Sequence, residues 1–598
     1  MAEAVGTALA VVGVLGQIFD GCVKAYGHFT TAAQFAEQSR GLACKLRIEE
    51  MRLVVWGRAW GVTEGKLEAH LMDAYGGDSS AGSTAATSRM APIGPGPLGG
   101  EGQGGAMMRS LAVQILSELH RTITDGQRLR ERYGLVEDEE KGMLNGSKKG
   151  ALGGAKEALI KRSSDQSSKN GGTNSSGSGE WSWRKEFSIR ARWVVADYND
   201  GLEQLFPASR IPAIQRTWVA ELLQSAQRDV EQLSLLENAS DAVYPKLNAS
   251  ANLKRLRINL DNEPHGKAAF KPTFAFKVAR PVLTVSDRDH KRSEGFHQRG
   301  SGSGSGSKDD VNDSNDQSDA VLIEWVDYDR EDLDEKFVHL RRLDQLARMM
   351  NSATDRHPDL HTIDCLGYTD DAARSRYGLV YKALEPTYAT LHTLISSNDL
   401  KTPDLNERVR LAQTLAVALW SLHSLDWLHK SLCSNNILFF PSAFTAAATQ
   451  PTATAALIPD ISSPYLVGFD ASRPDFDTDM SVASKNPSIL DLHRHPKSLS
   501  GLSRRPYCKS YDVYSLGLVL LEIGLWKPLQ AYYKPSYSAE RWRDRVVLPV
   551  LVPGLGNKTG RVYREVVERC LTATDDIGSE EAGQLMESVV AALESIHV

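Results

Sequence analysis

The chain has 598 residues, too many for one hydrophobic core, so its length predicts two to four structural units. Hydrophobic residues make up 41% and charged residues 24%, as in an ordinary globular protein. With 69 Lys and Arg against 75 Asp and Glu the formal net charge is -6, which excludes the global positive field of many nucleic-acid-binding proteins. Six widely spaced cysteines indicate reduced thiols and a cytoplasmic protein.

The first notable segment runs from Val5 to Phe19 and is almost purely apolar, without any charged residue. As a helix it would span about 22 Å, which is marginal against the ~30 Å apolar core of a bilayer. Two hypotheses stay open: a first helix buried in a bundle, or a helix that leaves the bundle and enters a membrane. The candidate membrane-active residues are Val5, Leu9, Val12, Leu15 and Phe19.

Several amphipathic patterns follow. Between Phe35 and Trp60 apolar residues recur with a period near 3.5, which predicts a long helix. Further helical patterns cover 107–133, 181–206 and 211–236. Together they predict an all-α helical bundle over 1–237. Gly- and Ser-rich composition near 76–105 and 141–179 predicts two disordered insertions within it.

One part of this bundle carries a family resemblance. From Leu46 to Gly57 the chain reads L-R-x-x-x-x-x-L-x-x-W-G. This segment, with the apolar opening helix, resembles the HeLo domain of fungal heterokaryon-incompatibility proteins, also called the prion-inhibition and propagation domain. The similarity covers about residues 1–235. It implies a helical bundle whose N-terminal helix can enter a membrane and cause cell death.

Residues 238–319 are predicted to be a partly structured connector followed by a flexible linker. Alternating apolar positions at Phe274, Phe276 and Val278 predict a strand or two. The stretch 286–319, with its Gly-Ser repeats and aspartates, predicts a linker.

The chain after residue 320 mixes strand and helix patterns. Strand character at 321–326 and in two segments within 360–384 surrounds a helix at 337–350, and a long helix follows over 404–428. That helix leads into Trp427–Phe440, whose spacing resembles the catalytic loop H-R-D-L-x-x-x-N of protein kinases. Residues 320–598 are thus similar to a kinase domain, and the resemblance implies an α+β bilobal fold.

Three charged positions of the kinase pattern are altered in this chain. Glu324 stands at the lysine of V-A-I-K, Ser431 at the catalytic aspartate, and Gly468 at the metal-binding aspartate of D-F-G. Kinases use these charges to hold nucleotide phosphates, metal and the nucleophile. A serine hydroxyl cannot act as a carboxylate base, so we expect no catalytic residue here.

No cofactor or metal is expected either. Asn436 remains a candidate for residual ATP binding, and Asn436 and Asp470 are the remaining candidates for a metal ligand. Residues with a structural role in the kinase pattern are kept: His429, Phe469, Asp512 and Gly517. Asp512 is expected to accept hydrogen bonds from the catalytic-loop backbone, and Asp344 is expected on the surface of its helix.

Three functions are consistent with this organisation. The favoured one is a HeLo-type effector of regulated cell death, held in check by a pseudokinase. The alternatives are a non-enzymatic scaffold and a divergent active kinase that uses Asp470 or another acid. The expected partners are other proteins and further copies of the chain, with a conditional membrane contact and no nucleic acid. We expect a cytoplasmic protein that reaches the plasma membrane on activation.

Overall fold

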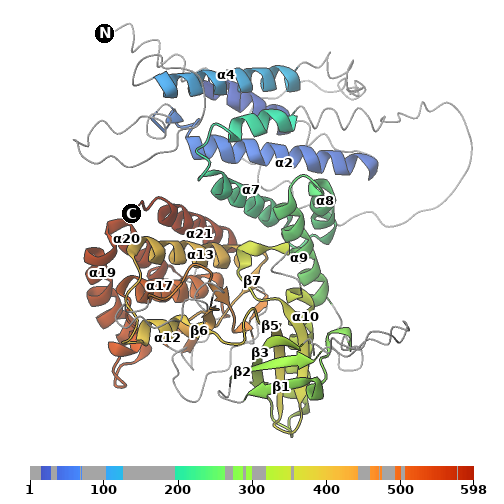
Figure 1. The fold of residues 1–598 in the computed structure, drawn as a ribbon. Coiled ribbons are helices and arrows are strands. Elements are labelled where there is room, and N and C mark those ends of the chain that lie inside the picture. The colour runs from blue at the N-terminus through green and yellow to red at the C-terminus, as the bar shows by residue number, and fades with distance from the viewer. Residues whose placement is uncertain are drawn as a thin grey trace, which may run out of the picture. The chain divides into compact units, whose positions relative to one another are not determined.

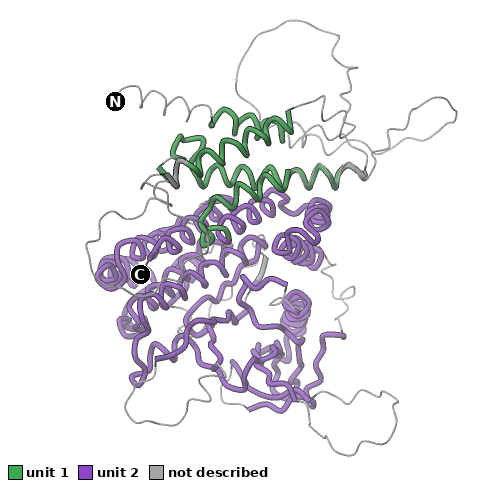
Figure 2. The backbone as a smooth tube through the Cα atoms, turned by 45° about the horizontal axis from the view of Figure 1, so that its top comes forward, with its two compact units in different colours: residues 1–211 green, residues 212–598 purple. Residues whose placement is uncertain are grey.

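The described part of the chain falls into two compact units, unit 1 (1–211) and unit 2 (212–598), coloured separately in Figure 2. The division lies at Ile211 and Pro212, whereas the sequence predicts a domain boundary at residue 237. The computed structural model describes residues 15–27, 37–67, 69–70, 103–124, 195–262, 274–286, 291–298, 318–351, 356–441, 458–469, 472–474, 492–499, 506–574 and 577–597.

The described part of unit 1 consists of helices joined by turns at 61–66 and 204–210 (Figure 1). This agrees with the predicted helical N-terminal region. The predicted insertions lie outside the described residues, apart from the first turn of α4. The helices cover residues 15–27, α2 (Glu37–Trp60), α4 (Gln103–Thr124) and residues 195–203.

Aromatic side chains of α2 form the centre of unit 1. The rings of Trp60 and Phe206 stack with centroids 4.7 Å apart. The indole Nε1 of Trp56 donates to the carbonyl of Leu202 at 2.8 Å, which satisfies its buried polar atom. These contacts hold α2 against the helix at 195–203.

A buried arginine strengthens the same helix pair. The side chain of Arg52 is only 2% exposed, and its guanidinium lies 3.0 Å from Glu49, 2.5 Å from Asp200 and 2.9 Å from Glu203. Several carboxylates around one guanidinium compensate its desolvation, which a single partner would not do fully.

Unit 2 contains a five-stranded antiparallel sheet with the order β1-β2-β3-β5-β4. Helix α10 (Leu333–Met350) packs against β4 and β5 (Figure 1). The predicted strands and the predicted helix at 337–350 are confirmed. The strands are β1 (Leu283–Ser286), β2 (Arg292–Gln298), β3 (Ser318–Asp327), β4 (Cys365–Asp371) and β5 (Arg376–Lys382).

The remainder of unit 2 is mainly helical. Its central helix is α17 (Lys509–Leu525), in which every residue is buried. Two small sheets, β6-β8-β9 and β7-β10, also belong to this part; α12 contacts β6 and β8, and α13 contacts β7. The further elements are β6 (Ala389–Thr390), α12 (Leu391–Ser396), α13 (Leu405–Ser424), β7 (Trp427–Leu428), β8 (Ile437–Phe439), β9 (Tyr465–Leu466), β10 (Arg473–Pro474), α19 (Val552–Thr559), α20 (Arg561–Leu571) and α21 (Ser579–Glu594).

Three helices precede the sheet within unit 2. They are α7 (Ile211–Ala226), α8 (Val230–Ser240) and α9 (Pro245–Asp261). The carboxylate of Asp229 caps α8 by accepting from the amides of Glu231 and Gln232. Pro245 starts α9, where its missing N–H costs nothing.

Three local predictions are wrong. Phe274 and Phe276 lie in a 3-10 turn, and the strand predicted within 270–285 begins only at Leu283, as β1. The predicted linker 286–319 contains β2, which pairs with β1 and β3. Asp344 is fully buried instead of exposed, and its carboxylate lies 3.2 Å from Arg348 one turn further along α10.

Candidate functional site

The candidate site lies where the sheet of unit 2 meets the loop after α13, and its centre is an ion pair. Arg292 of β2 stands opposite Glu324 of β3 in the antiparallel register. Its Nε lies 2.9 Å from Oε1 of Glu324, and the two side chains are 12% and 7% exposed. The strand pairing itself therefore fixes this pair in a mostly dry place.

The second carboxylate oxygen of Glu324 is also occupied. The hydroxyl of Tyr381, on β5, donates to Oε2 at 2.9 Å, and the backbone amide of Gly468 donates to the same atom at 3.0 Å. Burial, and then the nearby carboxylate, raise the pKa of Tyr381 well above its usual value. Glu324 thus joins β3, β5 and the segment after β9.

The guanidinium of Arg292 extends the network to the predicted loop. Its Nη1 donates to the carbonyl of Asn435 at 2.6 Å, and its Nη2 donates to Oδ1 of Asn436. The amide Nδ2 of Asn436 donates to the carbonyl of Ser431 at 2.6 Å. Burial would lower the pKa of Arg292, but the contact with Glu324 outweighs it and raises that pKa.

The backbone of Gly468 also packs against the network, next to Asn436. Its φ of +86° lies in the left-handed region that favours glycine. A Cβ at this position would lie 2.3 Å from Nδ2 of Asn436. An aspartate in this backbone conformation would therefore collide with the amide group that Ser431 and Arg292 hold in place.

The rings of His429 and Phe469 pack together next to this network. Their ring centroids are 4.8 Å apart, and both side chains are buried. The backbone amide of Ser431 donates to Nδ1 of His429 at 3.2 Å. Burial lowers the pKa of His429, which favours the neutral ring, and the bond from the Ser431 amide makes Nδ1 an acceptor.

Asp512 holds the loop by accepting hydrogen bonds from its backbone, as the sequence predicts. Its carboxylate accepts from the amides of His429 at 2.7 Å and Lys430 at 2.8 Å. It also accepts from the Tyr507 hydroxyl at 2.9 Å and faces Nε2 of His423 at 3.3 Å. Burial alone would raise the pKa of Asp512, but these donors and the histidine partners lower it overall.

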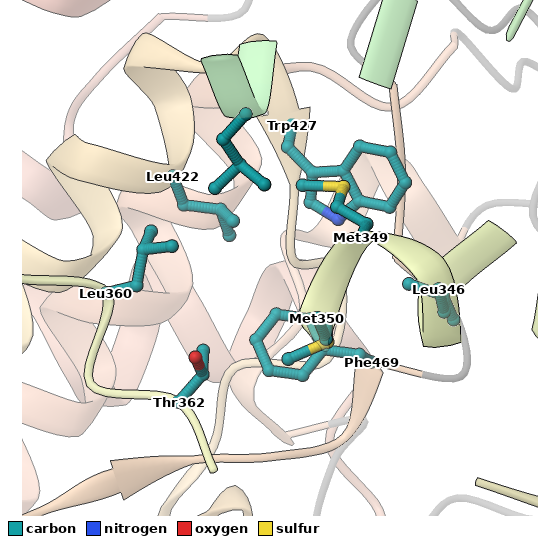
Figure 3. A pocket seen from close by; sticks show the side chains of 9 residues that line it. Leu346, Met349, Met350, Leu360, Thr362, Leu422, Trp427 and Phe469 are labelled. Atoms are coloured by element: carbon teal, nitrogen blue, oxygen red, sulfur yellow. The ribbon is translucent and has the colours of Figure 1, made fainter. Parts of the chain in front are cut away.

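Phe469 also lines a small apolar cavity of about 20 Å³ (Figure 3). It is large enough for one water molecule but offers almost no polar atoms to hold it. The cavity is lined by Leu253, Leu346, Met349, Met350, Leu360, Thr362, Leu422, Trp427 and Phe469.

The structure brings most of the predicted residues to one place. The residues that meet here are Glu324, His429, Ser431, Asn436, Gly468, Phe469 and Asp512. Gly517 lies elsewhere, where a Cβ would approach that of Cys570 to 2.8 Å, so it serves the close packing of α17 on α20. Asp470 lies outside the described residues.

Sequence reasoning missed Arg292. Its strand reads Arg-Ser-Glu-Gly-Phe-His-Gln, which has no run of apolar residues and no alternation of apolar and polar ones. The segment joins the sheet only because β1 and β3 pair with its two edges. No local sequence signal identifies it.

Chemically, the charged and polar groups of the network are paired with one another. The charge of Arg292 is balanced by Glu324, and Oδ1 of Asn436 accepts from the same guanidinium. The carbonyl of Ser431 is likewise occupied by Asn436, and serine supplies no carboxylate base. The arrangement binds the sheet to the loop and stabilises this connection.

The second predicted site is the N-terminal apolar segment. Leu15 and Phe19 are 5% and 4% exposed, and the Phe19 ring lies 6.5 Å from that of Trp56. In this structure these two residues are core residues of unit 1. The other candidates, Val5, Leu9 and Val12, lie outside the described residues.

The comparison with family models identifies the N-terminal part of the chain. Residues 6–236 match the HeLo family, described as prion-inhibition and propagation. This HeLo match suggests a cell-death or incompatibility-type role of the fungal kind. It begins before the first described helix and runs into α8.

The C-terminal part matches a family without a known role. Residues 333–590 match a domain of unknown function (DUF7580). None of the curated proteins matches the chain. No helix in the described ranges of the chain is both long and apolar enough to cross a membrane.

Proposed function

We propose that the chain is a HeLo-type signalling protein whose residues 320–598 form a pseudokinase that regulates the helical N-terminal part. The single observation that carries the proposal is the network around Glu324. In this network the Arg292 guanidinium is hydrogen-bonded to both the Glu324 carboxylate and the Asn436 side chain, and the Gly468 amide donates to Glu324. Glu324, Asn436 and Gly468 are the positions that resemble the phosphate and metal machinery of kinases.

Features of unit 2 support the kinase resemblance. An antiparallel sheet with one helix, α10, precedes a mainly helical part, and the loop 427–440 joins α13 to β8. Asp512 accepts from two amides of that loop, as the resemblance implies. The frame of the loop is thus kept, while the residues at the charged positions have been replaced.

The same network disfavours catalysis. A nucleotide phosphate at this place would meet the Glu324 carboxylate, and Arg292 is not available without breaking its pair. We expect no phosphoryl transfer and no bound cofactor, so other proteins remain as the ligands of unit 2.

Thermal unfolding of the full chain with and without ATP and Mg²⁺ tests this part of the proposal. We expect no change in Tm and no autophosphorylation. A rise of several degrees with labelled phosphate incorporation would favour the divergent kinase instead. Loss of that incorporation in Asp470→Asn would assign the activity to Asp470.

For the HeLo part we propose that activation frees the segment Val5 to Phe19 and lets it insert into a membrane. Because Leu15 and Phe19 are buried, release must first expose them, at a cost of about 1.5–3 kcal/mol for each side chain. That cost would keep the segment in the bundle until a stimulus or self-association compensates for it.

Dye leakage from anionic liposomes tests the membrane step. The full chain is compared with Leu9→Asp and with the matched control Leu333→Asp, whose side chain is 70% exposed in unit 2. We expect Leu9→Asp to abolish leakage and Leu333→Asp to leave it unchanged. Equal leakage from all three proteins, or none from any, would leave the scaffold as the better explanation.

A further inference from the structure

The end of the HeLo match belongs structurally to unit 2. The match extends to residue 236, so it includes α7 and the first turns of α8, yet both helices lie beyond the division at Ile211. Arg216 of α7 pairs with Glu594 of α21, and the Thr217 hydroxyl donates to the Glu587 carboxylate at 3.5 Å. Part of the HeLo-matching segment is thus held by the last helix of the chain.

A buried lysine on α9 connects these helices to the candidate site. Lys254 is 1% exposed, and its Nζ lies 2.8 Å from Oδ2 of Asp426. The same Nζ donates to the carbonyl of Leu223, in α7, at 2.9 Å. One ammonium group therefore joins α7, α9 and the turn that leads directly into Trp427.

Asp426 is the common partner of several cations. Besides Lys254, the Nζ of Lys509 lies 3.2 Å from its Oδ1, and Nη2 of Arg257 lies 3.8 Å from its Oδ2. Its φ of +53° places it in the left-handed region, where Asp and Asn are the most tolerant residues after glycine. The turn thus presents its carboxylate to α9 and to the start of α17 at once.

The same stretch of α9 also has an apolar contact with the site. Leu253, next to Lys254, lines the cavity together with Met349, Trp427 and Phe469 (Figure 3). Helix α9 therefore contacts the turn before Trp427 through an ion pair, and it shares an apolar cavity with Trp427 and Phe469. A movement of either element changes the surroundings of the other.

Together these contacts assign a regulatory role to α9. We propose that Lys254 and Asp426 form an autoinhibitory clamp that holds α7 and α8, the end of the HeLo match, against the rest of unit 2. The regulatory meaning rests on the proposed function. Because Lys254 is buried, separation from Asp426 leaves its ammonium group without this carboxylate, so opening the clamp costs free energy that a stimulus has to supply.

Hydrogen exchange of the full chain, followed by mass spectrometry, tests the clamp. The variant is Asp426→Asn, since asparagine keeps the left-handed turn and removes only the charge. Its control is Asp359→Asn: Asp359 also pairs with a lysine of α9, Lys246, at 3.1 Å, and both aspartate side chains are 21% exposed.

We expect amide hydrogen exchange over 211–261 to become at least tenfold faster in Asp426→Asn than in the parent chain. Exchange in α20 should stay unchanged. The control Asp359→Asn should exchange like the parent chain. Equal exchange in the two variants, or the same acceleration in α20, would overturn the clamp. If Asp426→Asn yields no folded protein, Lys254→Met is compared with Lys246→Met instead, and faster exchange over 211–261 in Lys254→Met alone would support the clamp. Hydrogen exchange needs neither ATP nor liposomes. A failure of the proposed function would appear in the ATP and liposome experiments and is therefore distinguishable from a failure of the clamp.

Discussion

Arg292 and Glu324 face each other across strands β2 and β3, with Nε and Oε1 2.9 Å apart. Each also has partners on other segments: Tyr381 and Gly468 donate to Glu324, and Arg292 donates to Asn436. The pair is therefore the point at which three strands and two loop segments are joined. Its removal should affect the stability of unit 2 more than one exposed ion pair would.

Glu324→Gln is expected to lower the free energy of unfolding by about 3–5 kcal/mol, because it leaves the buried Arg292 without a counter-charge. Chemical denaturation measures the change. The double variant Arg292→Met with Glu324→Gln should lose less than the sum of the two single variants, because it leaves no unpaired charge. Additive losses would show that the pair is not a coupled unit.

Gly468→Ala tests how tightly the Asn436 side chain closes the network against the backbone of Gly468. Gly560 is the matched control, since its φ of +83° is close to the +86° of Gly468 but nothing lies within 4 Å of its Cβ position. Both alanines are strained by the backbone, and only that at 468 also meets Asn436. We expect Gly468→Ala to cost about 1–3 kcal/mol more in urea unfolding. Equal costs would mean that Asn436 moves aside easily.

The altered positions at this site could be predicted because the motifs are local. Ser431 and Asn436 are five residues apart, and Gly468 precedes Phe469, so spacing along the chain identifies them. Asp512 was also predictable, since its segment on α17 follows a local pattern. Their convergence on one network is a property of the fold and not of any one motif.

The strand of Arg292 and the burial of Asp344 could not be predicted from local sequence patterns. The β2 sequence is polar, and only pairing with β1 and β3, which is non-local, makes it a strand. Asp344 follows the buried Leu343 on α10, and the sequence does not say that the buried face includes it. The prediction of a surface charge followed the usual behaviour of aspartate, which Arg348 overrides here.

Asp512→Asn is expected to destabilise unit 2 by about 3 kcal/mol or more. One carboxylate oxygen becomes an NH₂ group that cannot accept from the His429 or Lys430 amide. Asp544→Asn is the control, because that side chain is 56% exposed and lies 3.3 Å from its neighbour Arg543; its effect should stay within about 0.5 kcal/mol. Similar effects of the two changes in thermal unfolding would contradict the anchoring role.

Acidification should weaken the contact between α9 and the segment before β4. His357 faces the Ser250 hydroxyl at 2.7 Å, and burial lowers its pKa despite the nearby Asp359, with Lys246 acting in the same direction as burial. Its folded pKa lies below the unfolded value of about 6.5, so the unfolded chain binds the proton first and stability falls as pH drops below that value.

The variant His357→Gln should therefore lose less stability than the parent chain between pH 7 and pH 5. Denaturant unfolding at several pH values measures the slopes. His297→Gln, at a half-buried position of β2, is the control for removing a histidine. An unchanged slope in His357→Gln would assign the acid sensitivity to other buried histidines such as His429, whose pKa burial also lowers.

Two glycines of α2 offer a matched test of how firmly the N-terminal helix is held. A Cβ at Gly57 would lie 2.1 Å from Cζ of Phe19, whereas nothing lies within 4 Å of one at Gly41. Gly41→Ala should stabilise α2 by up to about 1 kcal/mol, because alanine is the better helix former. Gly57→Ala should instead displace the Phe19 ring and destabilise unit 1, as seen by thermal unfolding.

The same two variants connect packing to the proposed membrane step. If insertion requires Phe19 to leave its place against Trp56, Gly57→Ala lowers the cost of release and should increase liposome leakage at a given protein concentration. Gly41→Ala should leave leakage equal or reduced. Destabilisation by Gly57→Ala without a change in leakage would mean that release of this helix does not limit membrane activity, and the proposed role of Val5 to Phe19 would then be wrong.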